Sequence, residues 1–200
     1  MDTPDYLLPY LSATRRYGAG FGALLWASPR TQAARFAALL RAVDVNNLTI
    51  LDVGCGRGDL FTFMIHHGIC PAAYIGLEAV EALAAAAEAK RLSNARIIRG
   101  DFVRDPRQLE AGADVLLFSG SLNTLDERAF YQTLTNAYTA ARRAVVFNFL
   151  CSSDLAASSF LTWHRSEAVL AFARKQCDRV RLWDDYLKGD ATVAMEKEPL

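Results

Sequence analysis

The run Thr49–Leu60 constrains the possible fold more than any other stretch of the chain. Its sequence, TILDVGCGRGDL, is an apolar segment that reaches Asp52 and is followed by glycines at every second position, Gly54, Gly56 and Gly58. Such glycines let a strand turn sharply into a helix and let the backbone approach a ligand closely, because no Cβ obstructs either. The third glycine comes one residue earlier than in the dinucleotide fingerprint G-x-G-x-x-G. We therefore expect a loop that binds a small adenosine-bearing cofactor, with NAD not the first choice.

Apolar runs and helical patterns alternate along the chain after this loop. The apolar runs are nearly continuous, as in VLLFSG and AVVFNFL, which is typical of parallel strands covered on both faces. Two β-rich runs on either side of Lys188-Gly189-Asp190 predict an antiparallel C-terminal hairpin. Together these patterns predict an α/β fold, a Rossmann-like open and mostly parallel sheet with helices on both faces. The expected strands are 49–54, 73–78, 95–100, 113–119 and 143–150, and the expected helices are 30–43, 58–68, 81–92, 126–141 and 166–176.

Length and charge limit the classes of protein to which the chain can belong. Its 200 residues suit a single domain, with a helical or lid segment at 1–48 and a Rossmann-like core at 49–200. Lys and Arg number 22 together, as do Asp and Glu, so the balanced charge argues against a nucleic-acid partner. No apolar run is long enough to span a membrane, and no His, Asp or Glu cluster has the spacing of metal ligands. Four widely spaced cysteines and an acidic N-terminus favour reduced thiols in the cytoplasm.

Acidic or small residues also end the next three predicted strands, at the edge where open α/β sheets bind ligands. Glu78 lies 22 residues after Gly56, where a carboxylate can accept hydrogen bonds from ribose hydroxyls. Asp101-Phe102 can bind an adenine amino group and pack on the base, and Ser119-Gly120 leaves room beside the ligand. Structural alternatives stay open, because Asp52 can simply brace its turn and Gly-Asp is also an ordinary turn dipeptide.

Taken in order, the run LDVGCGRGDL, Glu78, Gly100-Asp101 and the run ADVLLFSGS resemble class I S-adenosylmethionine-dependent methyltransferases over about residues 48–197. The resemblance implies S-adenosylmethionine as cofactor and the sheet order 3-2-1-4-5-7-6, with strand seven antiparallel. It also implies that the glycines line the methionine part and the ribose, and that Asp52 supports the loop and the amino group. The cofactor site that it implies comprises Asp52, Gly54, Cys55, Gly56, Gly58, Glu78, Ala79, Asp101, Phe102 and Ser119.

The part before the first predicted strand allows two interpretations. Either the helix at 30–43 packs on the sheet while the aromatic residues fill gaps, or the segment is a lid over the ligand, with Tyr17 and Trp26 as its candidates. The stretch RYGAGFGALLWASPRTQAARF and the tail DDYLKGDATVAMEK are also similar to small, poorly characterised bacterial methyltransferases. That similarity supports the fold and the cofactor but supplies no substrate.

The methyl acceptor is harder to predict, because in-line methyl transfer needs positioning and exclusion of water more than one particular side chain. The run SGSLN after the fourth strand lacks the Asn/Asp-Pro-Pro-aromatic signature of family members that methylate nucleic-acid amino groups, which favours a small-molecule substrate. Asn148 is either a satisfied structural amide or a pocket residue, and Arg35 can reach a carboxylate of cofactor or substrate. The candidate catalytic residues are Tyr17, Asn123, Asn148 and His164, and Ser121 is a further candidate for the acceptor pocket.

Other functions remain as alternatives. An NAD(P)-dependent oxidoreductase on a Rossmann-like fold is disfavoured by the early third glycine. A non-catalytic cofactor-binding partner subunit is disfavoured by the combination of an intact glycine loop and Glu78. Aminopropyl transfer would place acidic residues near an amine acceptor, and SGSLN is followed by none until Asp126.

Overall fold

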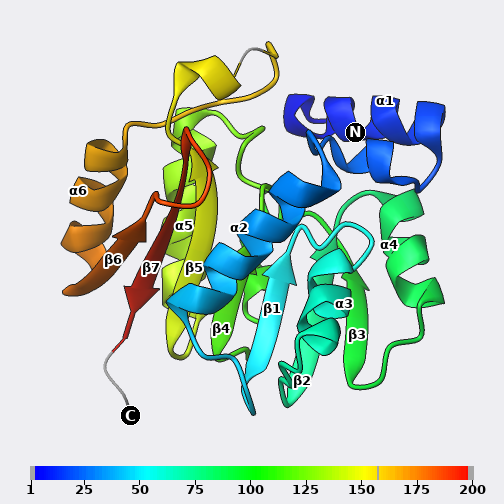
Figure 1. Cartoon of the computed structure of the whole chain (residues 1–200), viewed down its shortest axis with the longest axis horizontal. Coiled ribbons are helices and arrows are strands. Elements are labelled where there is room, and N and C mark those ends of the chain that lie inside the picture. The colour runs from blue at the N-terminus through cyan, green and yellow to red at the C-terminus, as the bar shows by residue number, and fades with distance from the viewer. Residues whose placement is uncertain (1–2, 157, 198–200) are drawn as a thin grey trace.

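A computed structural model describes residues 3–156 and 158–197, and within them a seven-stranded sheet forms the centre of the molecule (Figure 1). The strand order is β3-β2-β1-β4-β5-β7-β6, in which β7 runs antiparallel to β5 and β6 and the other pairs are parallel. The predicted α/β class, sheet order and C-terminal hairpin are therefore confirmed. The strands are β1 (Thr49–Val53), β2 (Ala73–Glu78), β3 (Ala95–Arg99), β4 (Val115–Phe118), β5 (Ala144–Leu150), β6 (Arg179–Trp183) and β7 (Asp190–Glu196).

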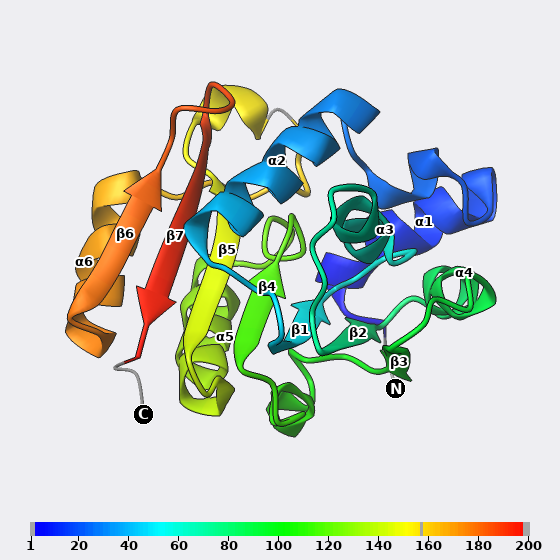
Figure 2. The same cartoon turned by 60° about the horizontal axis from the view of Figure 1, so that its bottom comes forward.

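Helices cover both faces of this sheet, as Figures 1 and 2 show. Along β4, Val115 and Leu117 pack with apolar residues of α2 and α3, whereas Leu116 and Phe118 pack with those of α5 and α6. Alternate residues of a strand point to opposite faces, so a continuous apolar run can supply two cores at once. The α-helices are α1 (Leu8–Tyr17), α2 (Pro29–Ala42), α3 (Asp59–His66), α4 (Glu81–Ala89), α5 (Glu127–Ala140) and α6 (Ser166–Gln176), and the 3₁₀ turns are η1 (Asp5–Leu7), η2 (Phe21–Leu24), η3 (Pro106–Leu109) and η4 (Ser153–Leu155).

Residues 3–28, which we name the N-terminal cover, lie beyond the carboxyl ends of the parallel strands (Figure 1). Ala23 of the cover is fully buried and packs with Val80 and Leu83, which follow β2. The cover passes into α2 through Ser28, whose hydroxyl accepts from the Thr31 N–H in a capping box at 3.2 Å. Such a cap satisfies backbone N–H groups that a helix start would otherwise leave unpaired. The cover thus packs against the start of α4 and continues directly into α2.

The element boundaries differ little from those predicted, and each difference has a local cause. The helix expected at 81–92 ends at Ala89, because Arg91 and Asn94 adopt left-handed backbone angles of φ 47° and 59° that no α-helix continues through. His66 and His67 lie at the exposed end of α3, as expected. All four cysteines are free thiols.

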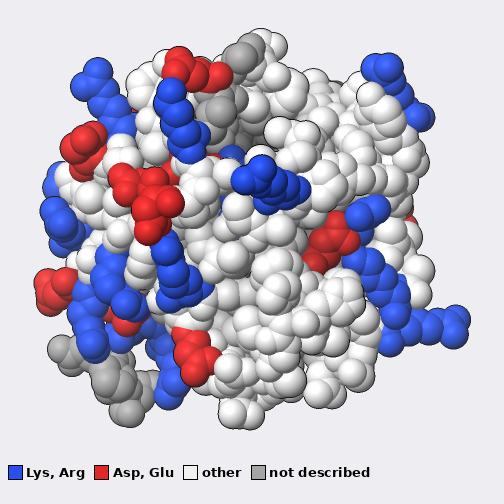
Figure 3. All heavy atoms as spheres, viewed as in Figure 1, with Lys and Arg blue, Asp and Glu red and all other residues white. Residues whose placement is uncertain are grey.

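Among the described residues, no helix is long and apolar enough to cross a membrane, and no group of His, Cys, Asp and Glu could hold a metal ion. On the face shown in Figure 3, basic and acidic side chains are interspersed and gather toward the side of β6 and α6. The surface over α2 carries few charges, and a second group of basic side chains lies toward α4.

Candidate active site

A cavity of about 270 Å³ runs along the carboxyl edge of the sheet from β3 to β7. The parallel strands β1 to β5 end there, and β7 begins there because it is antiparallel and its Asp190 pairs with Leu150. The N-terminal cover and α2 form the opposite wall. Residues that line the cavity include Tyr6, Tyr10, Leu24, Trp26, Gln32, Arg35, Asp52, Gly54, Cys55, Gly56, Asp59, Glu78, Ala79, Asp101, Phe102, Ser119, Ser121, Asn123, Leu150, Leu161, Leu187, Lys188 and Asp190.

The glycine loop forms the floor of the cavity beside β1. The backbone N–H of Gly54 donates to the Leu77 carbonyl at 2.8 Å, which anchors the loop to β2. Gly54 has φ +76°, and a Cβ placed there would lie 2.4 Å from the Ser121 Cβ. A Cβ on Gly56 would lie 2.9 Å from a methyl group of Leu24 in the cover. Both positions therefore need glycine for space as well as for conformation.

Gly58 has a different role from the one implied by the family resemblance. It has φ +69°, begins α3 as its N-cap and is absent from the cavity wall, and a Cβ there would meet Ala87 of α4 at 3.6 Å. The third glycine therefore permits the left-handed turn into α3 and the approach of α4, while only the first two face the cavity.

Glu78 ends β2 and is 7% exposed. One carboxylate oxygen accepts from the Gly56 N–H at 2.7 Å and the other from the Val80 N–H at 2.8 Å. Burial raises the pKa of this carboxyl, and the backbone hydrogen bonds oppose that effect. A carboxylate has about four acceptor positions, so Glu78 keeps acceptor capacity for a ligand in the cavity. Glu78 thus shapes the glycine loop and also presents acceptors beside it.

Asp52 is a deeply buried carboxyl group of the cavity wall, at 2% exposure. Tyr74 donates to it at 2.6 Å, and among the described residues it forms no ion pair. Burial raises its pKa to about 7, although the Tyr74 hydrogen bond acts in the opposite direction. In this position Asp52 can brace the turn after β1 and can also contact a ligand in the cavity.

Asp101 joins the turn after β3 to the N-terminal cover. One oxygen accepts from the Val103 N–H at 3.0 Å, and the other accepts from the Tyr6 hydroxyl at 2.7 Å. The neighbouring Phe102 lines the cavity and packs edge-on against Phe118, with ring centroids 5.9 Å apart. Asp101 is therefore a turn residue that also lines the cavity, and its link to Tyr6 was not predicted from the sequence.

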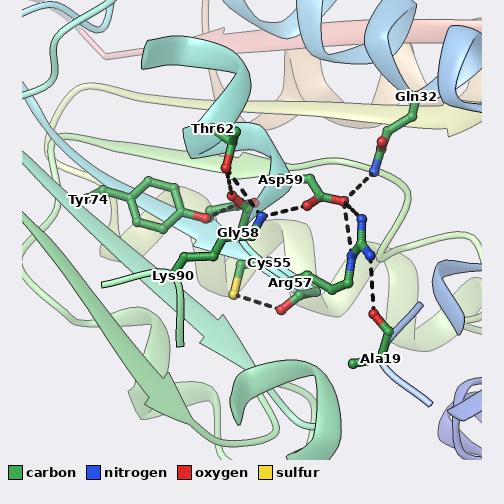
Figure 4. A network of polar contacts seen from close by, with 11 residues as sticks. Ala19, Gln32, Cys55, Arg57, Gly58, Asp59, Thr62, Tyr74 and Lys90 are labelled. Atoms are coloured by element: carbon green, nitrogen blue, oxygen red, sulfur yellow. Dashed lines mark hydrogen bonds and ion pairs between the residues drawn. The ribbon is translucent and has the colours of Figure 1, made fainter. Parts of the chain in front are cut away.

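Asp59, at the start of α3, forms a charged network that the sequence interpretation missed (Figure 4). Its carboxylate accepts from Lys90 at 2.7 Å and from Arg57 at 2.9 Å, and it accepts from Gln32 of α2 at 3.4 Å. Arg57 also donates to the Ala19 carbonyl of the cover at 3.2 Å. Burial raises the pKa of Asp59, but the hydrogen bonds from Lys90 and Arg57 outweigh it, so the pKa is lowered. The network connects the glycine loop, the cover, α2 and α4.

An ion pair between Arg35 and Asp190 lies at the far end of the cavity, over β5 and β7. Arg35 of α2 donates to Asp190 and stacks over the Trp26 ring, with its Cζ 4.9 Å from the ring centroid. Tyr186 donates to the other Asp190 oxygen. Arg35 was predicted to reach a carboxylate of cofactor or substrate, and the carboxylate that it contacts in the structure belongs to the protein.

The candidate catalytic residues fall into two groups. Asn123 lines the cavity just after β4, is 6% exposed, and its side-chain oxygen has no hydrogen-bond partner within the described part of the chain. Tyr17 is 49% exposed and lies outside the cavity wall. His164 is buried outside the cavity and stacks on Phe130 at 3.9 Å, and burial lowers its pKa.

Asn148 also lies outside the cavity wall, and its environment fits the structural alternative. The residue is fully buried, accepts from Ser119 at 3.1 Å and donates to Thr192 at 2.7 Å. A buried amide with these partners is satisfied within the protein. Of the four candidates, only Asn123 therefore contributes to the cavity.

Comparisons with known proteins agree with this geometry. Residues 50–144 match the protein family described as "Methyltransferase domain". The chain contains a methyltransferase domain. A search of curated proteins gave no match.

Similarity to solved structures identifies the fold class of the methyltransferase domain. Magnesium protoporphyrin IX methyltransferase from Synechocystis PCC 6803, with bound SAH, has a TM-score of 0.68 at 15% identity, over 97% of each chain. A SAM-dependent methyltransferase from Archaeoglobus fulgidus has a TM-score of 0.67 at 15% identity, over 94% of this chain and 99% of its own. Mitomycin 7-O-methyltransferase MmcR has a TM-score of 0.71 at 19% identity, over 98% of this chain and 61% of its own. The fold is that of the class I S-adenosylmethionine-dependent methyltransferases.

The residues of the methyltransferase domain fit the cofactor of this class. Gly54 and Gly56 both line the cavity and let the loop backbone face it without a Cβ. Asp52 offers a buried carboxyl without a cationic partner among the described residues, and the cofactor carries positive charge on its sulfur and its amino group. Glu78 keeps acceptor positions free for hydroxyl donors.

Proposed function

We propose that this chain transfers the methyl group of S-adenosylmethionine to a small-molecule acceptor by in-line displacement. The observation that carries the proposal is the distribution of side chains along this cavity. Asp52, the glycine loop, Glu78 and Asp101 gather over β1 to β3, whereas the walls over β4 to β7 hold none of these markers. The cofactor then occupies the β1–β3 half, which leaves the β4–β7 half for the acceptor.

In this proposal the strand ends hold successive parts of the cofactor. Asp101 and Phe102 face the adenine, Glu78 and Ala79 the ribose, and Asp52 the amino group. Gly54, Cys55, Gly56 and Ser119 complete the wall, and Gly58 acts only through the turn into α3. Burial and the nearby Glu78 charge raise the pKa of Tyr10 to about 12, so its hydroxyl stays protonated above the site.

When bound, the cofactor supplies an electrophilic methyl group on a cationic sulfur. The protein has to exclude water and to hold the acceptor atom in line with that methyl group. Leu24, Tyr10 and Trp26 of the N-terminal cover form the wall opposite the strand ends and exclude water. The unpartnered Asn123 oxygen lies just after β4, where it can accept a hydrogen bond from an N–H or O–H group of the acceptor.

We also infer that residues 1–48 and 49–200 act as a single domain. Tyr6, Tyr10 and Trp26 from the first part line the same cavity as the strand ends of the second. The cytoplasm remains the proposed compartment, on the basis of the four free cysteines.

Calorimetric titration of the purified chain with S-adenosylhomocysteine tests the proposal. We expect saturable one-to-one binding and no binding of NADH. Glu78→Gln should weaken the binding at least about tenfold, equivalent to about 1.4 kcal/mol. Glu81→Gln is the matched control, because Glu81 lies three residues away in the first turn of α4 with an exposed side chain. NADH binding without S-adenosylhomocysteine binding would favour the oxidoreductase instead.

A second assay addresses the acceptor class. The chain is incubated with methyl-labelled S-adenosylmethionine and either the low-molecular-mass or the macromolecular fraction of a cell extract. The proposal expects label in the low-molecular-mass products. Label only in protein or nucleic acid would contradict the small-molecule acceptor, and cofactor binding without any transfer would favour a non-catalytic subunit.

A further inference from the structure

The two halves of the cavity differ in charge. The β1–β3 half presents Asp52, Glu78 and Asp101, and the cavity wall there has no Lys or Arg among the described residues. The β4–β7 half presents two cations, Arg35 and Lys188, against one acid, Asp190. An acidic half suits the cationic cofactor of the proposed function, and the excess positive charge of the other half suits an anion.

Arg35 keeps donors for such an anion although it is paired. Its Nε and Nη2 both contact one oxygen of Asp190, and Tyr186 donates to the other oxygen. The carboxylate is therefore satisfied within the protein. The Nη1 group of Arg35 has no acceptor among the described residues, and the side chain is 12% exposed on the cavity wall. A guanidinium has five N–H donors, so a second acceptor can be bound while the Asp190 contact is kept.

Lys188 adds a second cation at the same end. It lies in the turn between β6 and β7, is exposed and forms no ion pair with any described residue. Trp26, Leu150, Leu161 and Leu187 also line the cavity. Apolar walls with a few placed polar groups are typical of sites for organic ligands.

The sheet geometry separates this end from the site of methyl transfer. Neighbouring strands lie about 4.8 Å apart, so the start of β7 is roughly 10 Å from the end of β4. An anion bound beside Asp190 would lie about two strand spacings from the end of β4. It can anchor a molecule whose nucleophilic atom reaches the end of β4 near Asn123.

We infer that the β4–β7 half of the cavity is a site for an apolar small molecule that bears a carboxylate, with Arg35 and Lys188 as its anchoring residues. The methylated atom of that molecule lies about two strand spacings from the carboxylate. The identification of the bound molecule as the methyl acceptor rests on the proposed function. The recognition of the anion by Arg35 and Lys188 is a separate property, which can be measured with or without the cofactor product.

The test compares probes of one shape and different charge. Dissociation constants of 2-naphthoate, its neutral amide and the cationic 2-naphthylmethylamine are measured by calorimetry, with and without saturating S-adenosylhomocysteine. We expect the carboxylate to bind at least about tenfold more tightly than the amide, and the amine to bind most weakly. Equal binding of carboxylate and amide, or preference for the amine, would overturn the inference.

Variants assign the preference to the two cations. Lys188→Gln alters an exposed side chain, and the double variant Arg35→Gln/Asp190→Asn avoids an unpaired buried carboxylate. Both should lower the preference for carboxylate over amide at least about threefold, whereas Arg30→Gln, an exposed position of α2, should retain it. Retention of the full preference in both variants would refute the assignment. Failure of S-adenosylhomocysteine to bind refutes the proposed function, while the probe comparison without it still tests the anion site.

Discussion

Replacement of Gly54 by alanine is the perturbation whose effect can be worked out most fully from the structure. Gly54 has φ +76°, a conformation that costs an alanine about 1 kcal/mol. The new Cβ would also lie 2.4 Å from the Cβ of Ser121, whose hydroxyl donates to the Val53 carbonyl at 2.5 Å. Relief of this contact requires a shift of the loop or of Ser121, and such overpacking costs about 1–3 kcal/mol. We expect Gly54→Ala to lower the free energy of unfolding by about 3 kcal/mol in all.

Gly68→Ala separates the conformational cost from the steric one. Gly68 has φ +69°, but a Cβ there meets nothing within 4 Å, and the residue lies outside the cavity wall. This variant should lose only about 1 kcal/mol. For a chain of this size, 1 kcal/mol corresponds to about 2–4 °C in Tm, so the two variants should be clearly resolved by thermal or denaturant unfolding.

The same pair of variants tests the position of the cofactor. Because Ser121 lines the cavity, its displacement should weaken S-adenosylhomocysteine binding at least about tenfold in Gly54→Ala, and Gly68→Ala should bind as the unchanged chain does. Equal loss of stability in the two variants would contradict the steric conflict with Ser121, and full affinity in Gly54→Ala would contradict the position of the cofactor.

Three further predictions concern single side chains. The Asp52 carboxyl has a pKa of about 7 in the folded state and 3.8 ordinarily, so between about pH 4 and pH 7 it keeps its proton in the folded chain and loses it in the unfolded chain. The free energy of unfolding should therefore fall as pH rises through this range. Asp52→Asn should flatten that part of a pH–stability curve, and an unchanged slope would contradict the raised pKa of Asp52. Asn148→Ala should lower the free energy of unfolding by about 2–4 kcal/mol, measured with denaturant, because it leaves Thr192 without its buried donor. The same variant should bind S-adenosylhomocysteine with unchanged affinity, and a selective loss of affinity would make Asn148 a pocket residue. Tyr6→Phe should cost about 1 kcal/mol through the lost hydrogen bond to Asp101 and should weaken S-adenosylhomocysteine binding, whereas full retention of both would show that the contact is unimportant.

The elements with strong local signals were predictable from the sequence. β2 and α6 have the bounds that their apolar patterns predicted, and the glycine loop, Glu78, Asp101 and Ser119 all lie on one cavity. Parallel strands bring their carboxyl ends to one edge, so residues far apart in the chain could be placed together by counting strands.

Contacts that depend on long-range packing were not predictable in the same way. Asp190 was interpreted only as part of a turn, although the antiparallel direction of β7 places the start of that strand at the ligand edge. The Asp59 network needs the relative positions of α2, α3, α4 and the N-terminal cover, which no local pattern encodes. Tyr17 was predicted as a lid residue because it is aromatic, yet it is exposed outside the cavity wall, and the aromatic residues of the cover that line the cavity are Tyr6, Tyr10 and Trp26.

The central claim is that one cavity is divided between a cofactor over β1 to β3 and an acceptor over β4 to β7. A crystal structure of the chain with S-adenosylhomocysteine tests it most directly. We expect ribose hydroxyls within hydrogen-bond distance of Glu78, the adenine beside Asp101 and Phe102, and the sulfur facing the end of β4. A ligand whose ribose lies away from Glu78, or whose adenine occupies the Arg35–Asp190 end, would contradict it.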